Sequence, residues 1–281
     1  MKLVKTIKEV RETVAEWKKS GLSVGFVPTM GFLHEGHQSL IRTAGENDKV
    51  VVSIFVNPIQ FCPGEDFEAY PRDIERDMKK CEEAGADLIF APEASEMYAD
   101  DFSTHIDMTG PTEELCGKSR PGHFSGVCTV VSKLFNIVTP DKAYFGQKDA
   151  QQLAVIRRMV RDLSINIEIV GCPIIREEDG LAKSSRNTYL SADERSAALV
   201  ISRSLAEGRK MLESGEKDLK KVSDTIISLI EKEPIAKIDY VKTVDADTII
   251  PKEKASGRTL VAAAVYIGKT RLIDNFIYEE A

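Results

Sequence analysis

Two of the four histidines in the sequence, His34 and His37, lie three residues apart directly after an apolar run. The run, residues 22–27, is typical of a buried strand, and the histidines fall where a helix is predicted to begin. Unpaired N–H groups at a helix start attract phosphate oxygens, and two imidazole donors would add directed hydrogen bonds. Gly36 leaves room for a close approach. The spacing favours phosphate binding, with a surface pair or part of a metal site as the alternatives. No third ligand lies nearby in the sequence, which disfavours zinc.

Two further segments combine small or hydroxyl-bearing residues with cations. Gly146, Gln147, Lys148 and Asp149 follow a short apolar stretch and again open a predicted helix. The loop 180–187 contains Lys183, Ser184, Ser185 and Arg186, which could wrap a triphosphate. A single loop of this kind is most often a solvated connection, so it indicates phosphate binding only together with a second motif such as the histidine-bearing helix start.

The elements that position these segments are predicted from apolar periodicity and from the placing of proline and glycine. Apolar runs at 22–27, 50–56 and 88–91 end before prolines, and a helix between the last two begins near Pro71 and ends at Gly85. This alternation of strand and helix predicts a parallel sheet with right-handed crossovers. In such sheets ligands bind beyond the carboxyl ends of the strands, where the candidate segments lie.

The rest of the chain divides into the end of this first domain and a second, smaller one. The first domain is completed by a helical face over 127–138, a strand at 143–145, a helix over 153–163 and a strand at 165–170. Beyond it we expect a helix opened by the capping box Ser191 to Glu194, a second helix ending before Pro234, and strands at 238–244, 259–267 and 271–277. The fold class is therefore α/β: a Rossmann-like parallel-sheet domain over 1–174 and a smaller α+β domain over 175–281.

Composition excludes several classes of protein. The chain has 281 residues, 42% of them hydrophobic, which disfavours disorder, and 38 basic against 45 acidic residues give a net charge of −7. This balance argues against nucleic acid as the main partner, because such binding needs clustered cations. The longest apolar stretch, 260–267, is far shorter than the ~20 residues of a membrane-spanning helix. The five cysteines fit neither a zinc site nor a disulfide framework, so we expect reduced thiols and a cytoplasmic location.

The candidate segments also carry a family resemblance. Residues 34–37 resemble the HIGH motif, and residues 183–186 the KMSKS-like loop, of the nucleotidylyltransferase superfamily that includes class I aminoacyl-tRNA synthetases. Six ordered motifs together resemble the pantothenate synthetase family over essentially the whole chain: 28–31, 56–58, 60–61, 117–126, 144–149 and 184–187. Lys183 departs from the family, which commonly has methionine there.

The resemblance implies a reaction in two steps. ATP and pantoate would give an enzyme-bound pantoyl adenylate and pyrophosphate, and the amine of β-alanine would then displace AMP to give pantothenate. It also implies a homodimer. The reaction should require Mg²⁺ to neutralise the polyphosphate, bound mainly through the nucleotide rather than by protein ligands. Because water must be kept from the adenylate, we expect the C-terminal domain to close as a lid. No nucleic-acid or membrane partner is implied.

The resemblance also assigns residues. ATP would be bound by Met30, Gly31, His34, Gly36, His37, Gly146, Lys148, Asp149, Ile175, Lys183, Ser184, Ser185 and Arg186. Among these, the candidate catalytic residues are His34, His37, Lys148 and Arg186, with His37 as the proton donor. Pantoate or β-alanine would be held by Gln60, Gln152, Asn57, Arg120 and His123. Arg120 could equally be a structural cation, and His123 could be a partly buried histidine whose hydrogen bonds are made within the protein.

Three other functions compete with this one. Another HIGH-type nucleotidylyltransferase would take a phosphorylated acceptor, which the neutral amides of Gln60 and Gln152 do not suit. A tRNA synthetase would need a basic RNA-binding face, and none is evident. A non-catalytic nucleotide-binding regulator would bind ATP but release no pyrophosphate when pantoate is added.

Overall fold

The computed structural model describes residues 1–280, which form two compact units. The first unit comprises Met1–Met108, Arg120–Gln147 and Val155–Pro173, and the second comprises Thr109–Ser119, Lys148–Ala154 and Ile174–Ala281. Two internal segments, 109–119 and 148–154, therefore belong with the C-terminal residues, which periodicity alone did not indicate. The assignment of 1–174 to ATP and pantoate binding and of 175–281 to a lid stays a prediction.

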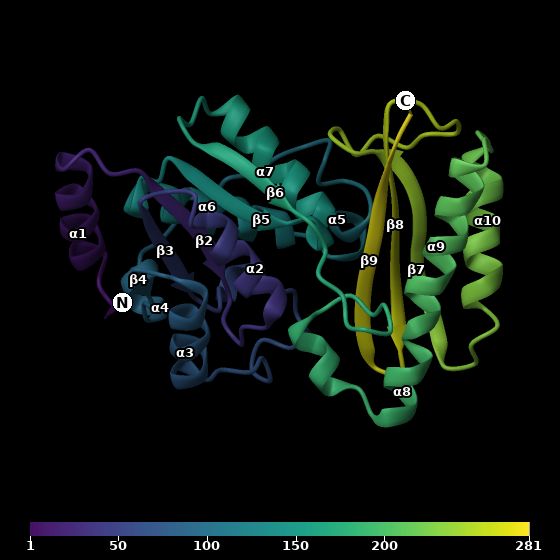
Figure 1. Ribbon diagram of the computed structural model, residues 1–281, viewed down its shortest axis with the longest axis horizontal. Helices are drawn as coiled ribbons and strands as arrows, with labels where there is room; N and C mark the ends of the chain where they lie inside the picture. Colours follow the sequence, from purple (N-terminus) through teal and green to yellow (C-terminus); the bar gives the residue numbers. More distant parts are fainter. Residues whose placement is uncertain (281) are drawn as a thin grey trace. The chain divides into compact units, whose positions relative to one another are not determined.

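A six-stranded parallel sheet forms the centre of the first unit (Figure 1), which confirms the predicted Rossmann-like architecture. Its strand order is β1-β4-β3-β2-β5-β6. The bounds are β1 Lys2–Val4, β2 Val24–Thr29, β3 Lys49–Ile54, β4 Leu88–Phe90, β5 Lys142–Gly146 and β6 Glu168–Cys172. The chain runs outward from β2 to β3 and β4 and then returns to the other side of β2 as β5. The carboxyl ends of β2 and β5 thus mark the point where the strand order reverses, the usual place for a ligand.

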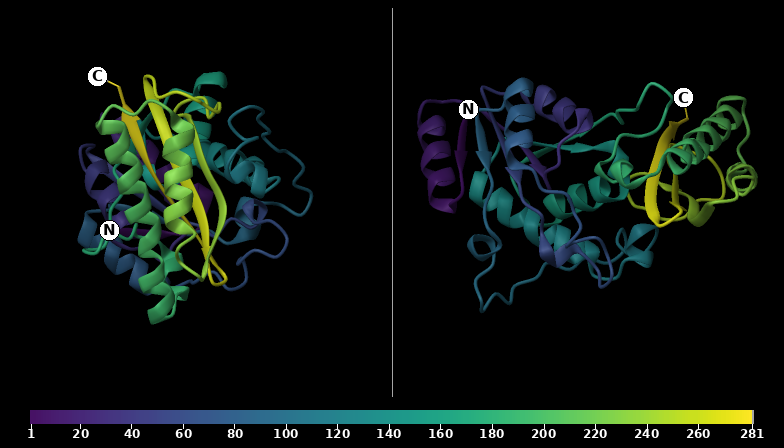
Figure 2. Two further views of the ribbon diagram at one scale, coloured as in Figure 1. Left: turned by 90° about the vertical axis from the view of Figure 1, so that its right-hand side faces the viewer. Right: turned by 90° about the horizontal axis from the view of Figure 1, so that it is seen from below.

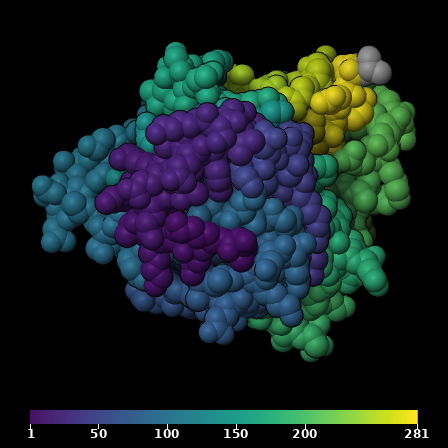
Figure 3. Space-filling model, turned by 60° about the vertical axis from the view of Figure 1, so that its left-hand side comes forward, coloured from purple at the N-terminus to yellow at the C-terminus, as the bar shows by residue number. Residues whose placement is uncertain are grey.

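Helices cover both faces of this sheet because right-handed crossovers in opposite directions place them on opposite sides. The bounds are α1 Ile7–Lys19, α2 Glu35–Ala44, α3 Ile74–Ala84, α6 His123–Val138 and α7 Ala150–Asp162, with the short turns η1 Pro58–Gln60 and α4 Ala94–Met97. In Figure 1, α2 lies in front of the strands, where it packs on β2 and β5. Helix α1 packs against α6 instead. The N-terminal residues, purple in Figure 3, lie at the surface of the face shown there.

Local sequence signals explain where several helices begin and end. Helix α3 begins at Ile74, three residues beyond the predicted start at Pro71, and the side chain of Asp73 caps it by accepting from the N–H of Arg76. It ends at Gly85, which has a left-handed φ of 94°. Helix α1 was not predicted from the sequence, although Thr6 and Glu9 form a capping box at its start.

The second unit is a three-stranded antiparallel sheet covered by two helices. The strands are β7 Ala236–Asp245, β8 Arg258–Ile267 and β9 Thr270–Glu279, in the order β7-β8-β9. Helices α9 (Leu199–Glu213) and α10 (Leu219–Ile230) lie on the same face of the sheet in both views of Figure 2 and bury Leu205, Leu212, Val222 and Ile226. Shorter elements are α5 Cys116–Ser119, η2 Gln147–Asp149, η3 Ser185–Tyr189 and α8 Ala192–Ala197.

The capping box at Ser191 is present, but the long helix predicted from it is divided into α8 and α9 at Ala198. Ala198 keeps right-handed helical angles, φ −58° and ψ −23°, so the chain bends without leaving helical geometry. Across residues 1–280, none of the helices has the length and apolar character that a bilayer span requires.

Candidate active site

His34 and His37 cap the start of α2 with their imidazole rings. The Nδ1 atom of His34 accepts from the N–H of Gly36 at 3.1 Å, and the Nδ1 atom of His37 accepts from the N–H of His34 at 3.2 Å. The two rings lie together, with their centroids 4.1 Å apart. Because each Nδ1 accepts a hydrogen bond, the neutral rings carry their protons on Nε2. The pair is therefore built into the helix start, and its Nε2–H groups are suited to donate to an anion.

The loop between β2 and α2 is held by a buried acid, Asp77 of α3. Its carboxylate, 1% exposed, accepts from the N–H groups of Phe32 and Leu33 at 2.7 Å each. Gly31 and Phe32 have left-handed φ angles of 86° and 49°, and a Cβ on Gly31 would lie 3.0 Å from the Asp77 Oδ2 atom. Burial raises the pKa of Asp77, against the opposing effect of the two N–H groups.

Sequence reasoning missed Asp77, although a signal was present. Ile74, Met78 and Cys81 define the apolar stripe of α3, and Asp77 lies on that stripe. A lone carboxylate on a buried helix face needs hydrogen-bond donors, here supplied by the backbone of the histidine-bearing loop.

Two buried amides, Asn57 and Gln60, lie beside the same loop in the first unit. The Nε2 atom of Gln60 donates to the sulfur of Met30 at 3.1 Å, and the Nδ2 atom of Asn57 donates to Oε1 of Gln60 at 2.9 Å. Asn57 Oδ1 accepts from the hydroxyl of Tyr98 at 2.7 Å, and its Nδ2 also donates to the carbonyl of Gly126 at 3.2 Å. The structure thus brings together two predicted substrate-binding residues and one predicted ATP-binding residue.

Arg120 and His123 join this cluster through a chain of hydrogen bonds. Arg120 donates to both carboxylate oxygens of Glu65, at 2.5 and 2.7 Å, and to Nε2 of His123 at 2.9 Å. His123 accepts at Nε2, so its proton is on Nδ1, which donates to the carbonyl of Gln60 at 2.8 Å. Burial acts to raise the pKa of Glu65, but the hydrogen bond and charge of Arg120 outweigh it and hold that pKa below its usual value. Both residues thus have structural partners, and their substrate contacts stay predictions.

In the second unit, Ile175 and Lys183 lie together across a short hairpin. The N–H of Lys183 donates to the carbonyl of Ile175 at 2.9 Å, and Arg176 forms a β-bridge with Ala182. The ammonium of Lys183 pairs with Glu177 at 3.0 Å. Glu177 therefore accommodates the lysine at the position where the resembling family commonly has methionine.

The loop after the hairpin is ordered by its own side chains. Ser184 caps η3, with its Oγ atom accepting from the N–H of Arg186 at 3.3 Å. Asn187 donates from Nδ2 to the carbonyl of Ala182 at 3.0 Å, and from its backbone N–H to the carbonyl of Ser184 at 3.1 Å. Ser184, Ser185 and Arg186 are thus presented by a closed turn.

The remaining predicted residues follow β5. Gly146 ends the strand in the first unit, while Lys148, Asp149 and Gln152 belong to the second. The ammonium of Lys148 lies 3.7 Å from the carboxylate of Asp149. Gln152 is half-buried.

Gln151, the neighbour of Gln152, has a structural role instead. It is 5% exposed, accepts from the N–H of Cys116 and donates to the carbonyls of Pro111 and Glu114. These bonds attach the segment 109–119 to the start of α7.

The predicted residues therefore fall into two groups, one in each unit. The first unit holds Met30, Gly31, His34, Gly36, His37, Asn57, Gln60, Arg120, His123 and Gly146, and the second holds Lys148, Asp149, Gln152, Ile175, Lys183, Ser184, Ser185 and Arg186. Both groups consist mainly of cations, N–H donors and amides, which suits anionic ligands. Among residues 1–280, no three His, Cys, Asp or Glu side chains gather where they could hold a metal ion.

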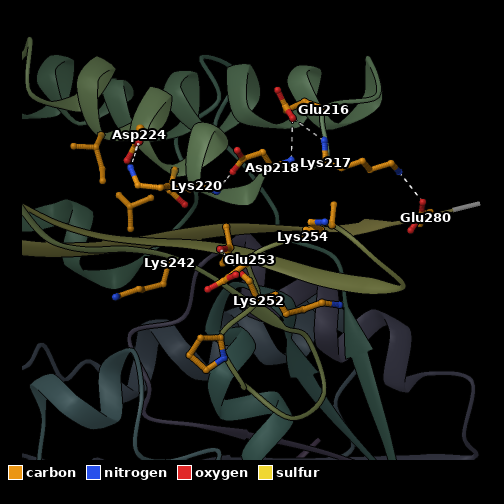
Figure 4. Close-up of a pocket in the computed structure, with 16 residues that line it drawn as sticks. Glu216, Lys217, Asp218, Lys220, Asp224, Lys242, Lys252, Glu253, Lys254 and Glu280 are labelled. Atoms are coloured by element: carbon orange, nitrogen blue, oxygen red, sulfur yellow. Dashed lines mark hydrogen bonds and ion pairs between the residues drawn. The ribbon is translucent and has the colours of Figure 1, made fainter.

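A groove of about 1140 Å³ in the second unit contains none of the predicted residues (Figure 4). It lies between α10 and the segment after β7, and its charges are largely paired, as in Lys217 with Glu280 and Lys220 with Asp224. Five lysines face five acidic residues along its lining, so it offers no net charge to a ligand. It is not part of the candidate active site.

Comparison with known proteins gives a consistent result. The family described as pantoate-beta-alanine ligase matches residues 2–277. A pantothenate synthetase of Ruminiclostridium cellulolyticum is 61% identical over 278 residues, which is 99% of each chain, and one of Clostridium botulinum is 61% identical over 280 residues, 99% of this chain and all of that one.

Solved structures agree. The pantothenate synthetase of Thermus thermophilus has a TM-score of 0.92 at 45% identity and covers 98% of this chain and 99% of its own. A pantoate-beta-alanine ligase of Francisella tularensis, described as a complex with an ATP species and β-alanine, has a TM-score of 0.78 at 36% identity and covers 99% of this chain and 97% of its own. Sequence, fold and site chemistry lead to one conclusion: the chain belongs to the pantoate–β-alanine ligase family, ATP-dependent enzymes that form an amide bond.

Proposed function

We propose that the two groups of residues bind ATP and pantoate and catalyse the formation of pantoyl adenylate, the first half of pantothenate synthesis. The observation that carries this proposal is the histidine-capped start of α2, held at the carboxyl end of β2 next to the amides of Asn57 and Gln60. A phosphate-binding helix start and a neutral polar subsite are what this reaction requires of one unit.

In the first step the pantoate carboxylate attacks the α-phosphorus of ATP. A carboxylate–phosphorus bond forms, and the bond to pyrophosphate breaks, with the electron pair leaving on pyrophosphate. The carboxylate is already ionised at neutral pH, so no general base is needed, and the residues act by positioning and by charge stabilisation.

Four residues carry that stabilisation in our proposal. His34 and His37 donate hydrogen bonds from Nε2–H to phosphate oxygens, and His37 is the proton donor of the hydrogen bond to the leaving pyrophosphate. Lys148 and Arg186 neutralise charge that develops on the phosphates. Met30, Gly31, Gly36, Gly146 and Asp149 would line the phosphates and ribose, Ile175 the adenine, and Lys183, Ser184 and Ser185 the triphosphate.

Pantoate would be oriented by Gln60 and Gln152, because an amide both donates to and accepts from a hydroxyl without repelling the carboxylate. Asn57, Arg120 and His123 would complete the subsite for pantoate or β-alanine. In the second step the β-alanine amine attacks the acyl carbon of the adenylate, the carbon–oxygen bond breaks, and AMP leaves with the bonding electrons while the amine releases a proton. The Francisella tularensis relative, described with an ATP species and β-alanine, supports this pair of ligands.

Mg²⁺ is the remaining ion in our proposal. Asp149 is the one acid among the proposed ATP-binding residues, and no cluster of acids that could hold a metal ion lies within residues 1–280, so the ion would be held chiefly by phosphate oxygens. When bound, it neutralises polyphosphate charge and favours the departure of pyrophosphate.

We also propose a cellular location and an oligomeric state for the enzyme. We place it in the cytoplasm, because all five cysteines are free and four of them are buried. The family resemblance supports a homodimer, which analytical ultracentrifugation of the purified chain tests.

A single mixing experiment tests the reaction itself. Enzyme, MgATP and pantoate are combined without β-alanine, and pyrophosphate is measured against enzyme concentration. We expect a burst equal to the enzyme and release of AMP only when the amine is added. Pyrophosphate release that requires β-alanine from the outset would exclude the adenylate.

A further inference from the structure

Two adjacent polar residues of β9, Asp274 and Asn275, are buried in a strand whose neighbours form the core of the second unit. They are 4% and 3% exposed. Side chains of successive strand residues leave the backbone in opposite directions, so neighbours on one strand can contact two different segments of the chain. Each of these residues does bind a segment outside the sheet, and each of those segments carries candidate ATP-binding residues.

Asp274 holds the hairpin that ends at Lys183. Its carboxylate accepts two hydrogen bonds from the guanidinium of Arg176, at 2.7 and 2.9 Å, which is the bidentate geometry that fixes an arginine most firmly. Arg176 in turn donates to the carbonyl of Gly180 at 3.0 Å. Because Arg176 is bridged to Ala182 and follows Ile175, one ion pair anchors both sides of the hairpin to β9.

Asn275 holds the second segment. Its Nδ2 atom donates to the backbone carbonyl of Lys148 at 2.8 Å. This bond fixes the main chain from which the Lys148 side chain extends. The two segments are separated by more than twenty-five residues along the chain, and adjacent residues of one strand contact both of them.

We propose that Asp274 and Asn275 are positioning residues, which set Lys148 and the 183–186 loop in one fixed geometry from a single strand. The proposal rests on the proposed function, because it takes these segments to bind the nucleotide. Neither residue touches the reacting atoms; each acts through the backbone or side chain that it holds. A shift of the phosphate-binding cations by a fraction of an ångström would slow adenylate formation, since the reaction depends on alignment.

The test uses Asp274→Asn, Asn275→Ala and Arg176→Gln in the full-length enzyme. Glu279→Gln is the matched control, because Glu279 also lies on β9 and pairs with an arginine, Arg258, but that pair is exposed and contacts no candidate residue. Four quantities are measured for each variant: single-turnover pyrophosphate release, the KM for ATP, kcat/KM for ATP and for β-alanine, and the hydrogen-exchange protection that ATP gives to residues 174–187.

We expect the three test variants to slow adenylate formation by about tenfold to a hundredfold and to raise the KM for ATP, while kcat/KM for β-alanine stays within about twofold. The protection that ATP gives to 174–187 should shrink in Asp274→Asn and Arg176→Gln, and combining these two should add little to either alone, because they remove the same ion pair. Glu279→Gln should match the wild type.

The outcomes separate this proposal from the proposed function. If ATP protects 174–187 in the wild type, and folded Asp274→Asn and Asn275→Ala keep wild-type adenylation rates, the positioning role is overturned. An equal loss of kcat/KM for ATP and for β-alanine would overturn it too, because a general loss of structure does not discriminate between substrates. If ATP leaves 174–187 unprotected in the wild type, the nucleotide assignment itself is wrong. If Asp274→Asn does not fold, the adenylation rate of Asn275→Ala tests the positioning role.

Discussion

His37 combines a structural and a proposed chemical task, and a pair of substitutions can separate them. His37→Ala removes both the cap on the N–H of His34 and the donor to phosphate, so we expect a stability loss of about 1 kcal/mol and adenylate formation slowed by about a hundredfold or more. His37→Gln restores a capping side chain at the third helix position but no imidazole. It should recover the stability, measured by denaturant unfolding, and not the rate. Recovery of the rate as well would remove His37 from the chemistry.

Asp77 offers a second test on the same loop. In Asp77→Asn one of the two backbone N–H groups, of Phe32 or Leu33, faces an amide nitrogen instead of an oxygen. Losing a buried charge-assisted hydrogen bond costs about 1.5–3 kcal/mol, and the loop that leads to His34 should loosen, with a raised KM for ATP. Asp73→Asn is the control, because asparagine caps a helix as well as aspartate does. Equal effects of both changes on the KM would contradict the special position of Asp77.

Glu65 gives a pH dependence with a defined sign. Its pKa in the folded protein is lower than its ordinary value, so its ionised form stabilises the fold above the unfolded-state pKa, about 4.3. That stabilisation is lost as the pH falls through the lower, folded value. The difference in unfolding free energy between wild type and Glu65→Gln should thus be about 1.5–3 kcal/mol at pH 7 and shrink below pH 4. Urea unfolding at both pH values measures it, and a difference that grows with acidity would refute the assigned ion pair with Arg120.

Among the elements, the contact between α6 and η1 determines where Asn57 and Gln60 lie. A Cβ on Gly126 would lie 2.4 Å from the carbonyl oxygen of Ile59 and 2.6 Å from Cα of Gln60, so Gly126→Ala must push η1 away from α6. Asn57 also donates to the Gly126 carbonyl. We expect the KM for pantoate to rise about tenfold or more, with the KM for ATP changed less. Ser125→Ala on the same helix is the control. An unchanged pantoate KM in Gly126→Ala would show that this contact does not set the subsite.

Most helices and strands of the fold could be predicted from the sequence. Strands β2 to β9 and helices α3, α6, α7 and α10 were predicted from apolar runs, from helical periodicity and from proline and glycine punctuation, which are local signals. The histidine-bearing helix start was readable for the same reason. Helix α1 was missed even though its capping box and its buried Val10 and Val14 were visible in the sequence.

What the sequence could not reveal is mostly single hydrogen bonds between distant residues. Asp77 with Phe32, Glu65 with Arg120 and Asp274 with Arg176 join positions 45, 55 and 98 residues apart. Charged residues with such partners have the same local pattern as solvated ones, so only tertiary structure separates them. The attachment of 109–119 through Gln151 is hidden for the same reason, because Gln151 and Gln152 are equivalent as sequence.

For the molecule as a whole, our proposal assigns residues of both units to one chemical step. Arg186→Ala alters the second unit and Gln60→Glu the first. We expect Arg186→Ala to slow the pyrophosphate burst about a hundredfold at saturating pantoate, because a cation facing developing charge is lost. Gln60→Glu should raise the KM for pantoate about tenfold or more, since a carboxylate repels the substrate carboxylate. Each variant should also keep its kcat/KM for β-alanine, because that ratio reports only the steps after the adenylate has formed. Rapid quench of ATP and pantoate without β-alanine measures the burst in both. If one variant keeps the wild-type burst rate and the wild-type dependence on pantoate, its residue takes no part in adenylation. If only kcat/KM for β-alanine changes, that residue acts in the second step.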